Sequence, residues 1–255
     1  MPAPTPPRIR KDSEEWGYID KSSWKGTCKT GKRQSPIDLD IGDAIVVNWE
    51  PLKFHNYDVR GEIVAENNGH TGGNLKGKYY LQQFHFHWDG NDRFGSEHTL
   101  NGLHYPMEVH FVHIREGLNE TTAPQSVGGI AVVGVQFQLA VQGEALFDLE
   151  KVTEATNSSG SLTTPPCSEG VIWSILSHPN FATNNQIRSL RRYLKEDGSL
   201  LIDNWRSVQP MNGRKLYLNK GIVKEEALDA AEVLEITSKV IPVILVFGVV
   251  LFAVL

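Results

Sequence analysis

Three histidines with strand-like spacing are the residues best suited to chemistry in this 255-residue sequence. In LQQFHFHW, His85 and His87 are two apart, and in MEVHFVHI, Glu108 and His110 are also two apart. Side chains two apart on a strand share a face, so two paired strands would bring three imidazoles together. Three neutral nitrogen ligands leave zinc one open position for water, whose pKa then falls to about 7. The spacing therefore predicts the zinc site of a lyase or hydrolase.

The segments that carry these histidines have the pattern of strands. Runs rich in β-branched and aromatic residues recur between Gly- and Asn-rich breaks, at 44–49, 61–66, 79–88, 107–114 and 129–141. The stretches 144–155 and 184–194 have apolar residues at helical spacing. We therefore expect a mostly β (α+β) single domain, with a large central, mainly antiparallel twisted sheet and short peripheral helices.

Composition excludes some partners and leaves others open. Acidic residues outnumber basic ones, 30 to 25, and the basic residues are scattered, so we expect no nucleic-acid partner. The two cysteines, Cys28 and Cys167, have no metal-type spacing and could be buried thiols or one long-range disulfide. The oligomeric state is unknown at this level.

The C-terminal end has the pattern of a membrane signal. Residues 240–255 contain no charged or hydrogen-bonding side chain, but a spanning helix needs about 20 residues. Small residues at 229–231 and a polar spacer, within 220–239, precede this tail as in a glycosylphosphatidylinositol (GPI) attachment signal. A tail anchor and a buried helix are the alternatives. Residues 1–15 form a Pro-rich, flexible lead-in without the apolar core of a signal peptide, so a surface location requires a signal upstream.

Several separated motifs over residues 16–219 resemble the α-class carbonic anhydrases. In order they are WGY at 16–18, RQSPIDL at 33–39, NNGH at 67–70, FHFHW at 84–88, GSEHT at 95–99, MEVHFVH at 107–113, SLTTPPCSEGVIW at 161–173 and NWRSVQPMNGR at 204–214. The resemblance implies one catalytic domain over 16–219. It also implies that a zinc-bound hydroxide hydrates carbon dioxide reversibly to bicarbonate and a proton.

The resemblance implies a role for each matching residue near the metal. His85, His87 and His110 would be the zinc ligands. Their other ring N–H groups would be held, in that order, by Gln83, the backbone carbonyl of Asn204 and Glu108, because a ligating imidazole needs a fixed orientation. Two further histidines, His98 and His113, are expected to be buried hydrogen-bonding residues of the core.

Further matches concern the nucleophile, the substrate and the proton. Thr163 would donate its hydroxyl proton to ionised Glu97, so its oxygen would only accept a hydrogen bond from the zinc-bound hydroxide. His70 would be the proton shuttle, since an exposed histidine both takes and releases protons near neutral pH. Carbon dioxide would lie beside Thr163 and Thr164, against an apolar wall of Val112, Val132, Leu162, Val171 and Trp173.

The cysteines and sequons point to a compartment once the resemblance is considered. Cys28 and Cys167 occupy the positions of a disulfide in extracellular, membrane-bound members. The sequons at Asn119 and Asn157 are candidate glycosylation sites. Together with the tail, these features favour a protein held on the cell surface by a GPI anchor.

One segment departs from the family pattern. The predicted helix at 144–155 runs through TNSSG at 156–160 directly into the threonine loop, where the family has a leucine-proline turn and an aromatic-rich strand. We expect this shortening to expose a sheet edge and to endanger the position of Thr163. An inactive surface or binding protein with the same fold is therefore the alternative function, and a different zinc hydrolase is a third. The three intact ligand histidines favour the enzyme.

Overall fold

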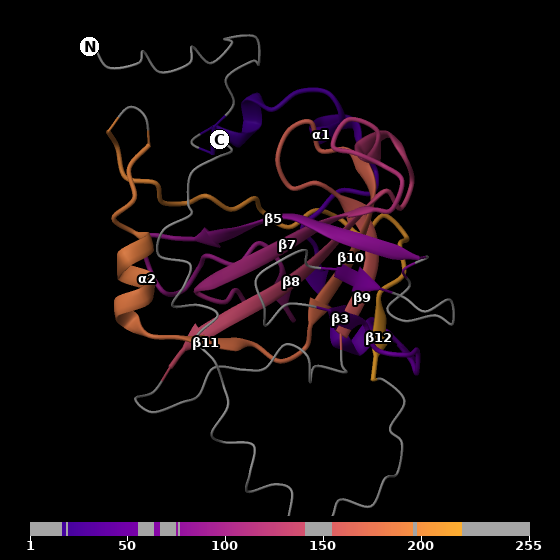
Figure 1. Cartoon of the computed structure of the whole chain (residues 1–255). Coiled ribbons are helices and arrows are strands. Elements are labelled where there is room, and N and C mark those ends of the chain that lie inside the picture. The colour runs from indigo at the N-terminus through magenta and orange to yellow at the C-terminus, as the bar shows by residue number, and fades with distance from the viewer. Residues whose placement is uncertain are drawn as a thin grey trace, which may run out of the picture.

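One large mixed β-sheet dominates the computed structural model, which describes residues 17–18, 20–55, 64–66, 75, 77–140, 155–195 and 198–220. Its strand order is β2-β12-β9-β10-β8-β7-β5-β4-β3, and β11 pairs with the end of β8 (Figure 1). The strands are β2 (Ile45–Val47), β3 (Lys53–His55), β4 (Val64–Glu66), β5 (Lys78–Trp88), β7 (Met107–Arg115), β8 (Ile130–Leu139), β9 (Ala155–Ser161), β10 (Glu169–Leu176), β11 (Asn180–Ala182) and β12 (Tyr217–Asn219). The expected mostly β, single-domain fold is confirmed.

Small elements surround this sheet. Strands β1 (Asp38–Leu39) and β6 (Thr99–Leu100) form a separate parallel pair. The helices within the described ranges are short: α1 (Thr27–Thr30), α2 (Asn184–Leu190), and the 3-10 turns η1 (Lys21–Ser23), η2 (Ile41–Asp43) and η3 (Ala123–Gln125). No helix in the described part of the chain is long and apolar enough to cross a membrane.

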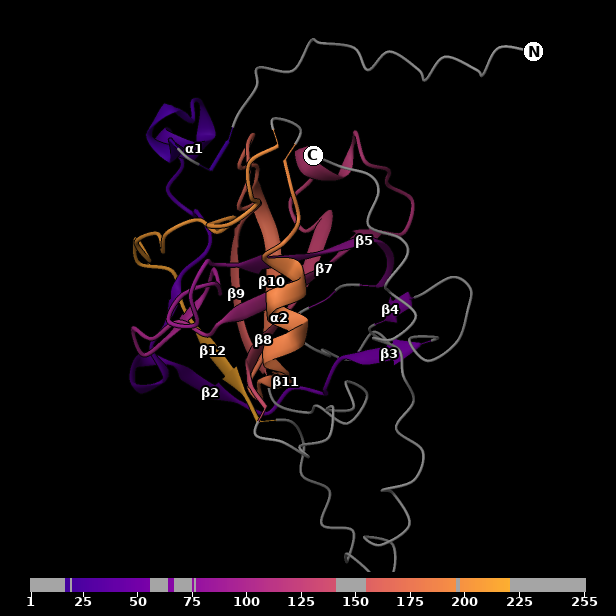
Figure 2. The same cartoon turned by 90° about the vertical axis from the view of Figure 1, so that its left-hand side faces the viewer.

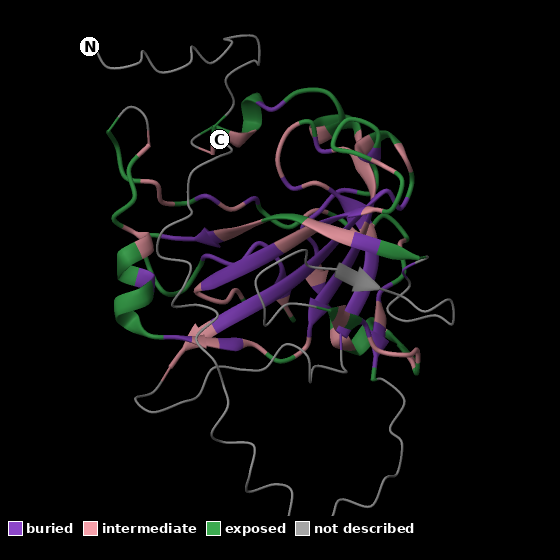
Figure 3. Ribbon diagram, viewed as in Figure 1, coloured by how far each residue is buried: buried purple, intermediate pink, exposed green. Residues whose placement is uncertain are grey.

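The centre of the sheet is buried on both faces. Strand β8 pairs antiparallel with β7 and parallel with β10, so its run IAVVGV lies between two neighbours (Figure 3). Because side chains alternate, Val132 joins Trp173 in an apolar cluster on one face, while Val133 joins Tyr79 in a cluster on the other. A strand covered on both faces has a continuous apolar run, as β8 does.

Helix α2 begins where the sequence predicts and ends earlier. Thr183 caps it: its hydroxyl accepts from the Gln186 backbone N–H, and the Gln186 side chain accepts from the Thr183 N–H at 2.8 Å. The helix lies at one side of the sheet and is mainly exposed (Figures 2 and 3). It ends at Leu190 rather than at 194, and Leu194 is 62% exposed. Because Leu194 is not packed against the core, its burial does not stabilise a longer helix.

The segment expected to be a connection is a strand. Residues 156–160 lie in β9, which is antiparallel to β10 on one side and to β12 on the other. The expectation of an exposed sheet edge at this position was therefore wrong, because β9 is hydrogen-bonded on both sides. The predicted helix at 144–155 is wrong at Ala155, which begins β9; residues 144–154 lie outside the described residues. Backbone groups of β10 and β12 need partners, and this need outweighs the low strand propensity of Ala, Asn, Ser and Gly.

Candidate metal centre

The three histidines come together on one face of β5 and β7. These strands are antiparallel, with His85 directly opposite His110 and His87 opposite Glu108. The ring centroid of His110 lies 5.2 Å from that of His85 and 4.4 Å from that of His87. One nitrogen from each ring lies within 4.8 Å of the others. The two-residue spacing in each strand therefore produces a three-imidazole cluster.

Each histidine is oriented by an acceptor at its other ring nitrogen. His85 Nδ1 donates to Gln83 Oε1, His87 Nδ1 donates to the Asn204 carbonyl, and His110 Nε2 donates to Glu108 Oε1, each at 2.7 Å. A carbonyl and a carboxylate can only accept, so they fix the tautomers of His87 and His110. The nitrogens left facing the cluster are lone-pair donors.

These lone pairs provide a test of whether a metal fits. His87 Nε2 and His110 Nδ1 lie 3.0 Å apart, and in the neutral tautomers just described neither carries a proton. Two lone pairs at this distance repel each other, and a shared cation relieves the repulsion. Three neutral imidazole nitrogens are a donor set that suits zinc and leaves it one position open. The residues present fit a zinc ion.

Burial keeps the imidazoles neutral. His87 and His110 are buried and His85 is partly buried. Burial lowers the pKa of His87 to about 4, and it also lowers the pKa of His85 and His110, which additionally repel their neighbouring histidines. At neutral pH the cluster is therefore in the unprotonated form that metals bind.

Glu108 connects His110 to a further buried histidine. It accepts from the His98 backbone N–H at 2.9 Å and from His98 Nδ1 at 2.7 Å, in addition to His110 Nε2. Burial alone would raise the pKa of Glu108, but the charge and hydrogen bonds of His98 and His110 outweigh it and hold that pKa well below its usual range. His98 and His113 are both buried, as expected for core histidines.

Glu97 is a buried carboxyl next to the same cluster. Its Oε1 lies 3.5 Å from His87 Nδ1 and accepts the Arg206 backbone N–H at 2.7 Å. Burial raises the pKa of Glu97 to about 7, while His110, the Thr163 side chain and the Arg206 N–H act in the opposite direction. The structure thus brings Thr163 and Glu97 together, although the shortened segment before Thr163 was expected to endanger its position.

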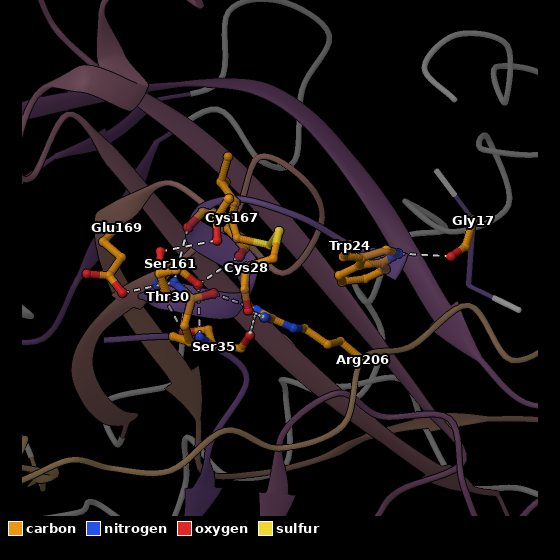
Figure 4. Close-up of a disulfide and its surroundings, with 12 residues drawn as sticks. Gly17, Trp24, Cys28, Thr30, Ser35, Ser161, Cys167, Glu169 and Arg206 are labelled. Carbon is orange, nitrogen blue, oxygen red and sulfur yellow. Dashed lines mark hydrogen bonds between the residues drawn. A yellow bond between two sulfur atoms is a disulfide. The ribbon is translucent and has the colours of Figure 1, made fainter. Parts of the chain in front are cut away.

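A disulfide joins α1 to the threonine loop, as the resemblance implied. Cys28 and Cys167 are bonded, and they are 139 positions apart in the sequence. Figure 4 shows the guanidinium of Arg206 reaching toward this region, where it donates to the carbonyls of Cys28 at 2.9 Å and Ser35 at 2.7 Å. Arg206 thus links the disulfide to Glu97 through its own backbone. Sequence reasoning missed this residue, and its presence in the motif at 204–214 was the available signal.

The expected apolar wall is a continuous group of side chains. Val112, Val132, Leu162, Val171 and Trp173 all belong to one apolar cluster. The Trp173 ring centroid lies 4.8 Å from that of His110, and its Nε1 donates to the Ser161 carbonyl at 3.0 Å. Thr164 is half-buried in the adjoining turn, where its carbonyl accepts from the Cys167 N–H. A dry surface therefore adjoins the histidines.

The remaining predictions concern His70, the C-terminal segments and the two candidate glycosylation sites. His70 and the C-terminal segments 221–239 and 240–255 lie outside the described residues. Asn119 is exposed, and its Oδ1 accepts from the Thr121 and Thr122 N–H groups. The glycosylation site predicted at Asn157 is wrong for this fold, because Asn157 lies inside β9 and is only 1% exposed. A glycan has no room at a side chain enclosed on both sides by strands.

The fold and the site together define a mostly β protein in which three oriented, neutral imidazoles on one face of the sheet could hold a metal ion. The chain belongs to the eukaryotic-type carbonic anhydrase family, whose model matches residues 12–158 and 146–220. These two matches overlap at 146–158, the region where the chain is short. Putative carbonic anhydrase 5 of Caenorhabditis elegans is 35% identical over 249 residues, which cover 79% of this chain and 80% of the relative.

Vertebrate relatives are similar over most of their length. Carbonic anhydrase 3 of Bos taurus is 32% identical over 255 residues, covering 79% of this chain and 97% of the relative. Carbonic anhydrase 5A, mitochondrial, of Rattus norvegicus is 30% identical over 241 residues, covering 76% of this chain and 79% of the relative. The family membership is thus carried by both the histidine strands and the segments around them.

Proposed function

We propose that this chain catalyses the reversible hydration of carbon dioxide to bicarbonate and a proton, with zinc held by His85, His87 and His110. The observation that carries this proposal is the set of three facing nitrogens, each on a ring whose other nitrogen has a hydrogen-bond acceptor at 2.7 Å. Family membership supports the class of reaction. A zinc ion bound there supplies a strong oxygen nucleophile at neutral pH.

The residues around the ligands each have a task in this proposal. Gln83, Glu108 and the Asn204 carbonyl keep the three rings pointing inward. Glu108 does so as a carboxylate, since its pKa is held low. It therefore makes His110 a more basic ligand than a neutral acceptor would.

Thr163 and Glu97 orient the nucleophile. When Glu97 is ionised, the Thr163 hydroxyl donates its proton to that carboxylate, and the Thr163 oxygen can then only accept. It would then accept a hydrogen bond from the attacking hydroxyl group, so that a lone pair of that group is turned toward the substrate. The Arg206 N–H holds the other side of Glu97 and favours its ionised form.

Substrate binding needs little more than a dry surface. Carbon dioxide is small and apolar, so it lies against Val112, Val132, Leu162, Val171 and Trp173, with Thr163 and Thr164 at the polar side. This wall excludes water from the face where the carbon is attacked. We further propose that His70, from its motif alone, accepts the proton that must leave after each cycle.

A stopped-flow assay of carbon dioxide hydration, paired with zinc analysis of the purified full-length chain, tests the proposal. We expect one zinc per chain and a hydration rate above the uncatalysed rate. His110→Ala should lose zinc affinity by more than about 100-fold, since even loss of a partner to a ligand costs 10–100-fold. His178→Ala, at an exposed histidine, is the matched control. Zinc bound without activity would establish the alternative, an inactive protein of the same fold.

We also propose a cell-surface location. The Cys28–Cys167 disulfide supports it, because disulfides persist mainly in oxidising compartments. In this proposal the catalytic domain covers 16–219, residues 220–239 are a spacer, and residues 240–255 direct attachment of a lipid anchor near Asp229. Release of the protein from intact cells by a phosphatidylinositol-specific phospholipase tests the anchor. Retention after enzyme treatment would favour a tail anchor.

A further inference from the structure

A cavity lies beside β9, on the same face of the sheet as the histidine cluster. Its volume is about 140 Å³. Leucine and isoleucine side chains line most of it: Leu39, Ile41, Leu100, Ile175, Leu176 and Leu218. Three polar side chains, Gln136, Thr156 and Ser177, line the rest. The cavity is thus amphipathic, with an apolar body and a polar part.

The small side chains of β9 explain why this space is open. Thr156 pairs with Ile175 and Ser158 pairs with Trp173, so Thr156, Ser158 and Gly160 share the face of the sheet that carries the cavity. A Cβ at Gly160 would lie 2.0 Å from Ser35 Oγ, which leaves no space at that end. Thr156 is therefore the largest side chain that β9 contributes to this face. Leu39 of β1 and Leu100 of β6 line the same cavity.

One polar atom in the cavity lacks a partner. Ser177 Oγ is buried and makes no hydrogen bond within the described protein. Gln136 differs, because its Nε2 donates to the His98 carbonyl at 2.8 Å and is thereby held in place. A buried hydroxyl without a partner is costly, and native proteins rarely keep one unless something else bonds to it.

We propose that this cavity binds a compact six-carbon ring that bears one hydroxyl group. An apolar cavity of about 150 Å³ in another protein accommodates benzene, so a ring of this size fits the volume. The ring would contact the six aliphatic side chains, and its hydroxyl would bond to Ser177 Oγ, with Thr156 beside it. Water alone suits the site poorly, because a bound water needs two to four polar partners and the lining is mostly apolar.

The cavity is separate from the metal centre. Its lining includes none of the three zinc-binding histidines, and one hydrogen-bonded route between the two sites runs from Gln136 to the His98 carbonyl, then from His98 to Glu108 and from Glu108 to His110. Ligand in the cavity would therefore touch none of the three zinc-binding histidines. The proposal does not depend on the proposed activity, and a failure of one leaves the other standing.

Binding of cyclohexanol to the purified full-length chain tests this proposal, measured by saturation-transfer NMR. We expect a dissociation constant on the order of 1 mM, as for a ligand of seven heavy atoms. Thr156→Phe places a ring in the cavity and should weaken binding by at least about tenfold. Thr121→Phe, the same change at an exposed threonine, should leave binding unchanged.

A second variant keeps the test informative if Thr156→Phe does not fold. Ser177→Ala removes only the hydroxyl, so we expect cyclohexanol to bind about threefold to tenfold more weakly while xenon binds as in the wild type. Cyclohexanol should be tested up to a concentration on the order of ten times the expected dissociation constant. If the wild-type chain does not bind it in this range, the proposal is overturned and water is the occupant. Wild-type affinity in a folded Thr156→Phe variant would overturn it too.

Discussion

The Ser174 hydroxyl of β10 donates a 2.7 Å hydrogen bond to Asn157 Oδ1, directly across the strand pair in β9. Asn157 Nδ2 in turn donates to the Ala155 carbonyl at 3.1 Å. Both side chains are buried. Strand β9 has no large apolar side chain, so satisfied polar groups of this kind, together with its backbone pairs, hold it between β10 and β12.

Replacing Asn157 should therefore destabilise the fold. Asn157→Ala leaves the buried Ser174 hydroxyl without its acceptor, and we expect the free energy of unfolding to fall by about 1–3 kcal/mol. Urea denaturation followed by tryptophan fluorescence measures this change. Asn185→Ala, at an exposed position in α2, is the matched control and should change stability by less than about 0.5 kcal/mol. Equal stabilities for the two variants would contradict the role of this hydrogen bond.

Features that depend on local sequence could be predicted, whereas features that depend on pairing between distant strands could not. The alternation in β5 and β7 is local, and it was sufficient to place His85, His87 and His110 on one face. The capping pair of Thr183 and Gln186 is local too, and it marks the start of α2. Residues 155–161 have no such signal, because only the neighbouring strands make them a strand.

Long-range contacts explain the residues that were missed. The Arg206 N–H bonds to Glu97 across 109 residues, and the Arg206 guanidinium bonds to the Cys28 carbonyl across 178. No spacing rule connects positions so far apart. The sequon at Asn157 misled for a related reason, since a three-residue pattern contains no information on burial. The family resemblance supplied the Cys28–Cys167 pairing, which the residues alone left undecided.

The acceptor on His110 should control metal affinity. Glu108→Gln replaces a carboxylate that receives three hydrogen bonds with an amide, whose NH₂ group must face either the His98 backbone N–H or the ring N–H groups of His98 and His110. We expect zinc affinity to fall by about 10–100-fold. Competition with a fluorescent zinc chelator measures it, and Glu120→Gln, at an exposed glutamate, is the control. Unchanged affinity in Glu108→Gln would show that Glu108 does not support the ligand.

Reducing the disulfide should destabilise the threonine loop and the whole domain. The Cys28–Cys167 bond closes a long loop, so its loss allows the unfolded chain many more conformations, at a cost of about 2–5 kcal/mol. Thermal unfolding with and without a phosphine reductant measures the effect. A double variant, Cys28→Ser with Cys167→Ser, should unfold like the reduced wild type and should not respond to the reductant. A wild-type midpoint unaffected by full reduction would contradict this expectation.

His113 should make stability depend on acidity. It is fully buried on β7, its Nδ1 donates to the Ala131 carbonyl at 3.3 Å, and burial lowers its pKa from 6.5 to about 4. The unfolded chain therefore binds a proton at His113 between pH 6.5 and 4 while the folded chain does not. Folding is accordingly favoured above pH 6.5, and this contribution is lost as the pH falls toward 4, by on the order of 3 kcal/mol.

Urea denaturation of the metal-free chain at a series of pH values between 7.5 and 4 tests this dependence, since zinc release then contributes nothing. His113→Gln keeps an N–H donor near the Ala131 carbonyl but has no titrating group, so its stability should fall less steeply below pH 6.5 than that of the wild type. His178→Gln, at an exposed histidine, should keep the wild-type slope. Parallel curves for the wild type and His113→Gln would mean that His113 carries its proton in the folded protein, and that its burial does not hold it neutral.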